Sequence, residues 1–328
     1  MKKAVVSLSV AVIMLLVGFV AWPTNSFGTD VKETVVDIPE GVSYISDIKA
    51  MPNGELILTG GNQQEKTLIK YVSKDQGKTW TKECEYLHQL PLDLSGAAVV
   101  EGFATVSDDG YVAIAVYTYE KDLHYITSEN EDELGTELYA YIIKPNGDII
   151  EVDQPVTDEY GGYLNTYFAG DKLYFDDIRG NMYEIDRDNG KLIGRVMEDT
   201  NFLGASPVIN GDELSVVTED EMGYPCGTPF PKGTDPETWQ LSEDWQAYSF
   251  VADIVKGEAD TYYIADIDGI SIYSKANGKQ LIHKNNRSDV NQYSDFYDIA
   301  AINDDTIIVH SWNEKSEAEQ LVKYKITK

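Results

Sequence analysis

The 328-residue sequence is strongly acidic: 56 aspartate and glutamate residues stand against 26 lysine and arginine residues, giving a formal net charge of −30. A charge of this sign repels nucleic acids and anionic lipids, so we expect no nucleic-acid partner and no membrane contact beyond the N-terminal segment. The length suits one large β domain or two small ones.

The N-terminal segment has the layout of a secretory signal peptide. Two lysines precede an uncharged apolar stretch from Ala4 to Trp22, and Ser26 and Gly28 place small residues at the two positions that a signal peptidase reads. We therefore expect a signal peptide over residues 1–28 and a protein that is secreted or works on the extracellular side of the bacterial membrane. The alternative is an uncleaved N-terminal anchor, because the apolar stretch is long enough to span a bilayer.

After residue 28, short runs rich in β-branched and aromatic residues alternate with tight turns. Asn-Gly and Asp-Gly pairs mark the turns at Gly54, Gly110, Gly147, Gly190, Gly211, Gly269 and Gly278. These pairs supply the positive φ angles that hairpin turns need. No long segment shows apolar residues at helical spacing with capping signals, so the pattern predicts an all-β chain made of hairpins.

The turns repeat. One set joins an apolar strand to a second, strongly apolar strand, and it comprises the turns at Gly54, Gly110, Gly170, Gly211, Gly257 and Asn303–Asp305. Their spacing of roughly 40–60 residues, with four short strands in each unit, is typical of β-propeller blades. Six such turns predict six blades, and a seventh is the alternative if residues 220–247 contain a degenerate unit.

The repeat also predicts the strand pairs. The inner pairs are expected at 44–59, 98–117, 164–176, 204–218, 248–265 and 297–311, and the outer pairs at 67–87, 138–153, 182–196, 269–284 and, poorly defined, 225–241. The last blade ends after its third strand. We therefore expect Glu33–Ile38 to pair beside residues 320–328, which closes the ring and makes residues 29–328 a single propeller domain.

One hairpin carries a specific motif. Ser73, Asp75, Gly77, Thr79 and Trp80 fit the pattern S-x-D-x-G-x-T-W. This segment resembles the Asp-box, or BNR, repeat of sialidases and of many non-enzymatic propellers. The resemblance covers one hairpin and implies a turn between the third and fourth strands of a blade, away from the ligand face. We interpret these five residues as structural, because serine, aspartate and glycine stabilise turns and tryptophan packs between sheets.

The arginine pattern departs from a sialidase. The resemblance would imply three arginines around a substrate carboxylate, but none of the four arginines lies in the first two predicted blades, and none precedes isoleucine or proline. Without a guanidinium cluster a carboxylate has no bidentate clamp. We therefore expect a sialidase-like propeller that lacks the arginine triad, and we assign no catalytic residue.

Metal and disulfide sites have little support. The four histidines show no zinc-ligand spacing, so no metal site and no cofactor are expected. Asp186–Gly190 and Asp266–Gly269 resemble calcium loops but lack the glycine and glutamate of a full loop, so we interpret them as hairpin turns, with a loosely bound calcium as the alternative. Cys84 and Cys226 fall on nearly opposite sides of the predicted ring, which argues against a disulfide.

Ligand sites of propellers gather on the face formed by the loops that join second to third strands and one blade to the next. The longest of these predicted loops are 118–136 and 219–232, and long loops often carry function. The candidate ligand-binding residues combine aromatic, acidic and basic groups near the blade starts: Tyr160, Tyr163, Arg179, Asp289, Tyr293, Asp295 and Tyr297. Aromatic faces beside carboxylates suit sugar or peptide recognition.

The sequence therefore predicts an exported, monomeric, non-catalytic propeller that binds a carbohydrate, a peptide or another protein at the cell surface. The alternative is a glycoside hydrolase or a lyase that uses carboxylates in the central funnel.

Overall fold

A computed structural model describes the chain over residues 30–120, 137–153, 163–177, 181–197, 206–210, 213–219, 225–226, 251–256, 261–266, 269–274, 280–285, 294–303, 305–313 and 316–327. Side chains are described for residues 31–120, 137–153, 165–177, 181–196, 298–303, 305–313 and 316–326. Residues Val31–Thr327 form one compact unit. Within the described ranges the only helix is a short 3-10 helix, and none is long and apolar enough to cross a membrane.

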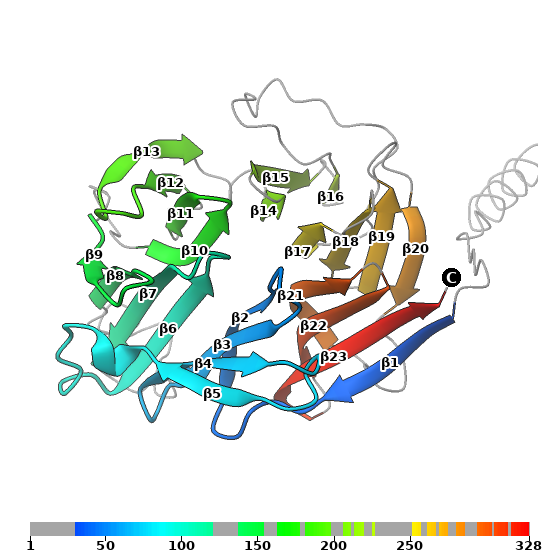
Figure 1. Ribbon diagram of the computed structural model, residues 1–328, viewed down its shortest axis with the longest axis horizontal. Helices are drawn as coiled ribbons and strands as arrows, with labels where there is room; N and C mark the ends of the chain where they lie inside the picture. The colour runs from blue at the N-terminus through cyan, green and yellow to red at the C-terminus, as the bar shows by residue number, and fades with distance from the viewer. Residues whose placement is uncertain are drawn as a thin grey trace, which may run out of the picture. The chain divides into compact units, whose positions relative to one another are not determined.

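The described strands form six sheets (Figure 1). Three four-stranded sheets come first in the chain: β2 (Tyr44–Ala50), β3 (Leu56–Asn62), β4 (Thr67–Ser73) and β5 (Thr81–Glu85); β6 (Val99–Val106), β7 (Val112–Tyr119), β8 (Glu137–Ile143) and β9 (Ile149–Glu151); β10 (Tyr163–Ala169), β11 (Lys172–Asp177), β12 (Met182–Ile185) and β13 (Leu192–Met197). The 3-10 helix η1 (Leu87–Gln89) joins the first sheet to the second.

The other three sheets are β14 (Ser206–Asn210), β15 (Glu213–Glu219) and β16 (Pro225–Cys226); β17 (Val251–Lys256), β18 (Thr261–Asp266), β19 (Gly269–Ser274) and β20 (Gln280–Asn285); and a closing sheet of β21 (Ser294–Asn303), β22 (Thr306–Asn313), β23 (Ala318–Thr327) and β1 (Asp30–Val36). Consecutive strands within each sheet pair in antiparallel fashion.

The first strands of the sheets contact one another in a closed series. Strand β2 contacts β6, β6 contacts β10, β10 contacts β14, β14 contacts β17, β17 contacts β21, and β21 contacts β2. Each sheet therefore covers the face of the next one, so that the sheets share their cores around a common axis. The chain is a β-propeller.

The strand pairs predicted from the turn spacing are confirmed where the structure describes them, as is the closing strand: β1 lies next to β23, blue beside red in Figure 1. The sequence missed η1, which buries Leu87. Within residues 220–247, the place of the alternative seventh unit, the structure describes only residues 225–226, so the count of six blades stays a prediction.

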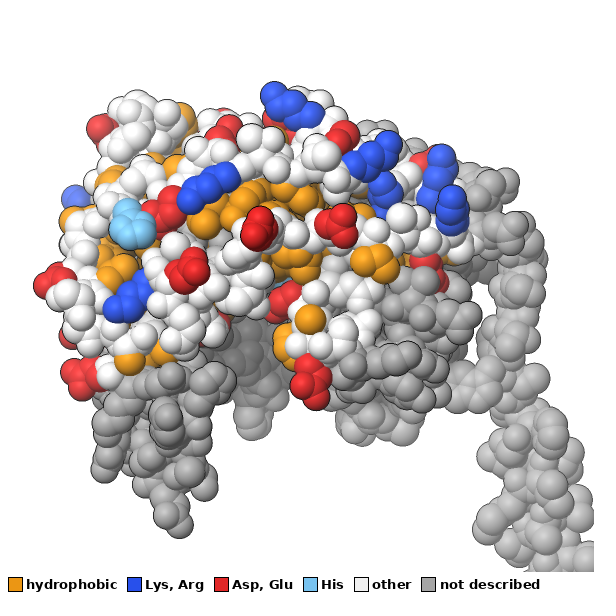
Figure 2. All heavy atoms as spheres, turned by 90° about the horizontal axis from the view of Figure 1, so that it is seen from below, with side chains coloured by type: hydrophobic (Ala, Val, Ile, Leu, Met, Phe, Trp, Pro, Cys, Tyr) orange, Lys and Arg blue, Asp and Glu red, His pale blue; other side chains and the backbone are white. Residues whose placement is uncertain are grey.

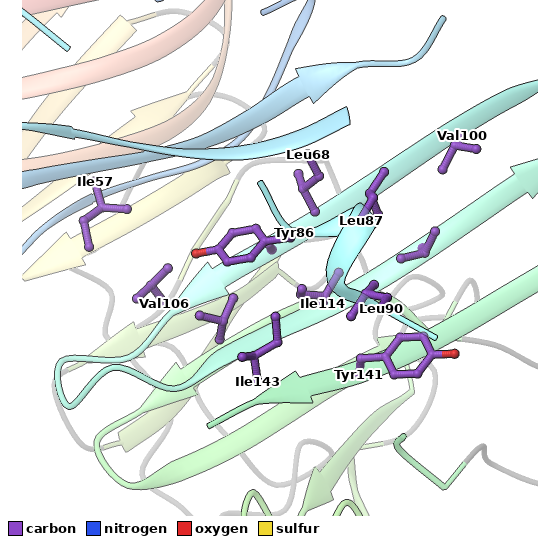
Figure 3. Close-up of a cluster of buried hydrophobic side chains, with 13 residues drawn as sticks. Ile57, Leu68, Tyr86, Leu87, Leu90, Val100, Val106, Ile114, Tyr141 and Ile143 are labelled. Carbon is purple, nitrogen blue, oxygen red and sulfur yellow. The ribbon is translucent and has the colours of Figure 1, made fainter. Parts of the chain in front are cut away.

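Alternating side chains build one core on each face of a sheet. The core between the β2–β5 and β6–β9 sheets contains Leu68, Val100 and Ile114, all fully buried, together with Tyr86 and Leu87 from the segment that joins the two sheets (Figure 3). The opposite face of the β6–β9 sheet packs on β11 through residues such as Ala113 and Phe175. Burying each large apolar side chain contributes about 1.5–3 kcal/mol.

A third core joins the chain's two ends to the first blade, and we call it the seam core. It is made of Val36, Ile45, Ile48, Leu56, Leu58, Ile69, Tyr71, Ala300, Ile308 and Leu321. These residues come from β1, from the β2–β5 sheet and from β21–β23. The N-terminal strand is therefore part of a buried core as well as the end of a sheet.

Candidate functional site

The described loop face carries two partly or fully buried acids on neighbouring sheets. Glu101 is the third residue of β6, which starts at the loop face, and Asp176 is the penultimate residue of β11, which ends there. Both acids therefore lie at the same edge of the propeller. Shifted pKa values of titratable groups are a physical sign of a functional site, and burial raises the pKa of both carboxyls.

Glu101 is held by polar and aromatic groups. Its Oε1 accepts a hydrogen bond from Gln63 Nε2 at 2.9 Å. Burial raises the pKa of the Glu101 carboxyl above its usual range, and the hydrogen bond from Gln63 opposes that rise. In the β6–β7 register Glu101 lies directly opposite Tyr117 and therefore on the same face of the sheet. The carboxyl is thus placed among aromatic rings in an environment that disfavours its charge.

Aromatic rings continue from Glu101 toward the first blade. The Phe103 and Tyr117 rings meet edge to face, with centroids 5.9 Å apart, and the centroids of Tyr44 and Phe103 are 6.4 Å apart. The backbone N–H of Gly102 donates to the Tyr44 hydroxyl at 3.0 Å. Burial raises the pKa of the Tyr44 phenol, and the charge of Glu101 raises it further.

Asp176 is the second acid. Its Oδ1 accepts a hydrogen bond from the Asn165 backbone N–H at 2.8 Å, and its Oδ2 accepts one from the Tyr167 hydroxyl at 2.9 Å. Asn165 lies where the β10–β11 register shifts, so its backbone N–H has no partner on the neighbouring strand. The Asp176 carboxylate accepts the hydrogen bond from this N–H instead. Burial nevertheless raises the pKa of the Asp176 carboxyl.

Tyr117 connects the two acids electrostatically. Burial raises the pKa of its phenol, and the charges of Asp176 and Glu101 both add to the rise. Burial and the charge of Glu101 also raise the pKa of Tyr119, which lies two residues after Tyr117 at the loop-face end of β7. We call Tyr44, Glu101, Tyr117, Tyr119 and Asp176 the carboxyl–tyrosine cluster.

The scaffold under this cluster is tied across the blades. The Thr105 and Thr166 hydroxyls, on β6 and β10, are hydrogen-bonded at 2.7 Å. Next to Asp176, the Asp177 carboxylate accepts hydrogen bonds from the Asn181 backbone and from the Tyr183 hydroxyl, at 2.9 and 3.0 Å. Such buried and satisfied polar groups hold the neighbouring side chains in fixed positions.

The structure places three of the predicted ligand-binding residues by backbone only. Tyr163 begins β10 opposite Asp177, and Asp295 and Tyr297 lie in β21, where Asp295 pairs with Trp312. Tyr160, Arg179, Asp289 and Tyr293 lie outside the described residues. The register therefore brings Tyr163 next to the carboxyl–tyrosine cluster, and the role of all seven residues stays a prediction.

The motif residues Ser73–Trp80 lie in the turn between β4 and β5, the third and fourth strands of their sheet. The Ser73 hydroxyl donates to Asp75 Oδ1 and accepts from the Gly77 N–H, both at 2.8 Å. Asp75 accepts hydrogen bonds from the Thr79 backbone N–H at 2.8 Å and from its hydroxyl at 2.7 Å. Each polar side chain of the motif thus binds within the turn itself.

The same turn packs on the closing strand. Trp80 Nε1 donates to the backbone carbonyl of Asp37 at 2.9 Å, just after β1. Gly77 has a φ of +85°, and a Cβ there would stand 3.0 Å from Val36 Cγ1 and 3.4 Å from Ile308 Cδ1. Glycine is therefore required twice, by the left-handed backbone and by the close approach to the seam core.

Replacing Asp75 with asparagine should destabilise the protein in a way that depends on pH. Hydrogen bonds from Thr79 lower the pKa of Asp75 to about 2, so the folded state favours the ionised carboxylate. The stabilisation is present above the unfolded pKa of about 4 and is lost as the pH falls toward 2. Thermal unfolding should give a lower Tm for Asp75→Asn at pH 6, with the difference from the wild type shrinking on acidification. A difference that is constant with pH would contradict this account.

The calcium-like segment Asp186–Gly190 is a hairpin turn. The Asp186 carboxylate accepts hydrogen bonds from the Asp188 N–H at 2.9 Å and from Asn189 Nδ2 at 2.6 Å. Its oxygens are therefore engaged in the turn. Within the described ranges no group of three or more histidine, cysteine or acidic side chains is placed to hold a metal ion. Gly269 begins β19, and Asp268 lies outside the described residues.

Cys84 is a free cysteine on β5. Its sulfur accepts a hydrogen bond from Gln89 Nε2 at 2.9 Å. Cys226 belongs to β16, in a sheet that is separated from the β2–β5 sheet by other sheets on either side of the series.

Comparisons with known proteins concern the fold. No family model matches the sequence, and no curated protein does. A solved structure of a protein of unknown function from Dyadobacter fermentans is 12% identical with a TM-score of 0.54, and the match covers 90% of this chain and 99% of that one. At this identity the likeness shows the fold alone.

Two solved lyases are also similar. A catalytically inactive virginiamycin B lyase from Staphylococcus aureus, solved with quinupristin, is 16% identical with a TM-score of 0.48, and the match covers 90% of this chain and 99% of that one. A streptogramin B lyase is 13% identical with a TM-score of 0.47, and the match covers 90% and 98% of the two chains. Likeness at this level carries no functional argument. The Asp-box relationship stays a resemblance.

Proposed function

We propose that the protein is an exported binding propeller that recognises a carbohydrate or a peptide through the carboxyl–tyrosine cluster. The observation that carries this proposal is the position of Glu101 and Asp176 at the loop-face ends of β6 and β11, where the charges of both acids raise the pKa of the Tyr117 phenol. Aromatic faces with a few convergent polar groups are the usual make-up of a small-ligand site.

Glu101 and Tyr119 offer different kinds of contact to a ligand. Glu101 offers carboxylate oxygens to a ligand hydroxyl or ammonium group, and hydrogen bonds of this charge-assisted kind are the strong ones. Tyr119 is partly exposed and offers a ring face and a hydroxyl. The net charge of −30 favours a neutral or cationic ligand over an anionic one.

The test starts with the full chain on a glycan array and on a peptide array, and the best ligand is then titrated. Glu101→Gln keeps the side-chain size and should weaken binding by about 10-fold or more, because it removes the charge from the hydrogen bond. Glu151→Gln, an exposed change on the outer strand β9, is the matched control and should leave binding unchanged. Equal affinities for wild type and Glu101→Gln, or no ligand on either array, would contradict the proposal.

A second candidate is a lyase or a glycoside hydrolase at the same site. The raised pKa of Glu101 favours it, because burial makes this carboxyl hold its proton more tightly than an exposed glutamate does, and a protonated carboxyl can act as a general acid. The bound glycan should then be converted to new reducing ends or to unsaturated products, and Glu101→Gln should abolish turnover while binding persists. Binding without any product would exclude this candidate for that ligand.

A further inference from the structure

Five lysines line the outer rim of the propeller at the seam between the closing sheet and the first blade. We call them the rim lysines: Lys32 on β1, Lys78 in the β4–β5 turn, Lys82 on β5, and Lys323 and Lys325 on β23. Four of them are exposed, and Lys323 is half-buried. Figure 2 shows one face of the molecule, on which lysine and arginine side chains lie among acidic and hydrophobic ones.

Strand alternation puts these lysines on the same side of their strands as the seam core. Lys323 lies opposite Ile308 in the β22–β23 register, and Lys82 lies opposite Tyr71 in the β4–β5 register. Ile308 and Tyr71 both belong to the seam core. Since opposed residues share a face of the sheet, the lysines of the closing sheet and of the first blade face each other across the seam.

Contacts confirm that the two sides are close. Lys323 Nζ donates to the backbone carbonyl of Gln76 at 3.2 Å, across the seam in the β4–β5 turn. Burial lowers the pKa of Lys323, the nearby positive charge of Lys78 lowers it further, and the negative charge of Asp75 opposes the shift. Lys323 and Lys78 therefore lie close together at the rim, with Asp75 near them.

Some lysines outside the rim form ion pairs with acidic side chains. Lys49, Lys70 and Lys74 form ion pairs with Asp108, Glu83 and Glu55, at 2.8, 2.6 and 3.2 Å. No carboxylate of the described chain lies within ion-pair distance of a rim lysine. The chain contains 56 acidic residues, more than enough to supply each lysine with a carboxylate partner. Unpaired cations that converge on one rim therefore point to a partner outside the chain.

The position of the rim in the chain indicates which anionic partner it meets. Seven residues, 23–29, separate the apolar stretch that ends at Trp22 from β1. Such a segment reaches at most about 25 Å. With the apolar stretch kept as an anchor, this segment would hold β1, and Lys32 on it, within that distance of the membrane. Cleavage after Gly28 would remove the tether.

We propose that the rim lysines bind anionic phospholipid headgroups on the outer surface of the membrane that the chain crosses. This inference does not rest on the proposed ligand site. It revises the expectation of no membrane contact, which used the net charge of the whole chain. At physiological ionic strength charges more than about 8 Å away are largely screened. The headgroups therefore respond to the charges of the rim lysines and not to the net charge of the whole protein. Lysine suits this partner, because it acts as a point charge without bidentate geometry.

The test is lysine footprinting of the full chain in lipid nanodiscs. The protein is reconstituted in phosphatidylcholine alone and in phosphatidylcholine with phosphatidylglycerol, and acylation of each lysine is followed by mass spectrometry. Lys78, Lys82 and Lys325 should be acylated about five times more slowly in the anionic bilayer, the protection expected for roughly 1 kcal/mol per lysine. The exposed Lys191 is the internal control, and high salt should remove the protection.

A variant separates lipid binding from packing within the protein. Lys78→Gln with Lys82→Gln should restore the acylation rate of Lys325 in the anionic bilayer, whereas Lys144→Gln with Lys191→Gln should not. Equal acylation in the two bilayers would overturn the proposal. So would protection of the rim lysines by soluble polyphosphate without any protection by the anionic bilayer, because the partner would then be a free phosphate polymer.

Discussion

Replacing Val36 with aspartate is expected to destabilise the protein by about 4 kcal/mol or more, because an unpaired charge would enter an apolar core. Val36 is 6% exposed, packs in the seam core and stands against Gly77 of the β4–β5 turn. Aspartate there would detach β1 from both the closing sheet and the first blade. Denaturant unfolding followed by tryptophan fluorescence measures the loss.

The neighbouring residue provides the control. Val35 lies on the same strand and is 53% exposed. Val35→Asp therefore keeps the same chemical change without burying the charge, and surface substitutions of this kind change stability by about 0.5 kcal/mol or less. If the two variants unfolded at the same denaturant concentration, β1 would not be anchored by its inward face.

Replacing Gly61 with alanine should also destabilise the protein strongly, by at least about 3 kcal/mol. A Cβ on Gly61 would stand 1.8 Å from the backbone oxygen of Thr67, and its second backbone contact is the Thr67 carbonyl carbon at 2.7 Å. Residues 61 and 67 belong to the same hairpin, whose pairing continues through Asn62 and Thr67. Relief of the clash would require the β3–β4 hairpin to open.

Gly194 is the matched control for this change. It also lies within a strand, β13, but a Cβ there meets nothing within 4 Å. Gly194→Ala should leave stability unchanged or raise it slightly, because alanine loses less backbone freedom than glycine on folding. Equal destabilisation of the two variants, measured by thermal unfolding, would contradict the steric account of Gly61.

The turns made most of the fold predictable. Gly54, Gly110, Gly147 and Gly190 follow asparagine or aspartate in the sequence, and all four have positive φ in the structure. Few other residue pairs form such a turn readily. Each turn therefore fixes where the strand before it ends and the strand after it begins. The helix η1 escaped prediction because its residues are held by tertiary contacts: Leu87 is buried against the β6–β9 sheet, and no periodic pattern marks so short a segment.

The candidate site was harder to predict, because its members come together only when the blades stack. Glu101 and Asp176 are far apart in the sequence, and each looks like one acid among 56. A usable signal was present: Glu101 interrupts the apolar strand β6 near its loop-face end, and Asp176 begins an acidic pair that ends the apolar strand β11, so both acids must find partners when they are buried. The sequence pattern instead favoured seven residues near the blade starts, and four of those seven lie outside the described residues.

The pairing of β1 with β23 joins the first and the last strand that the structure describes. These two strands are separated by nearly the whole described chain, so their pairing closes the longest loop in the described fold and carries the largest loop-closure entropy. Without β23, the edges of β1 and β22 would both stay unpaired, and unpaired strand edges promote aggregation. With β23 in place, β1 and β22 are both paired on this side, and the exposed edge is absent.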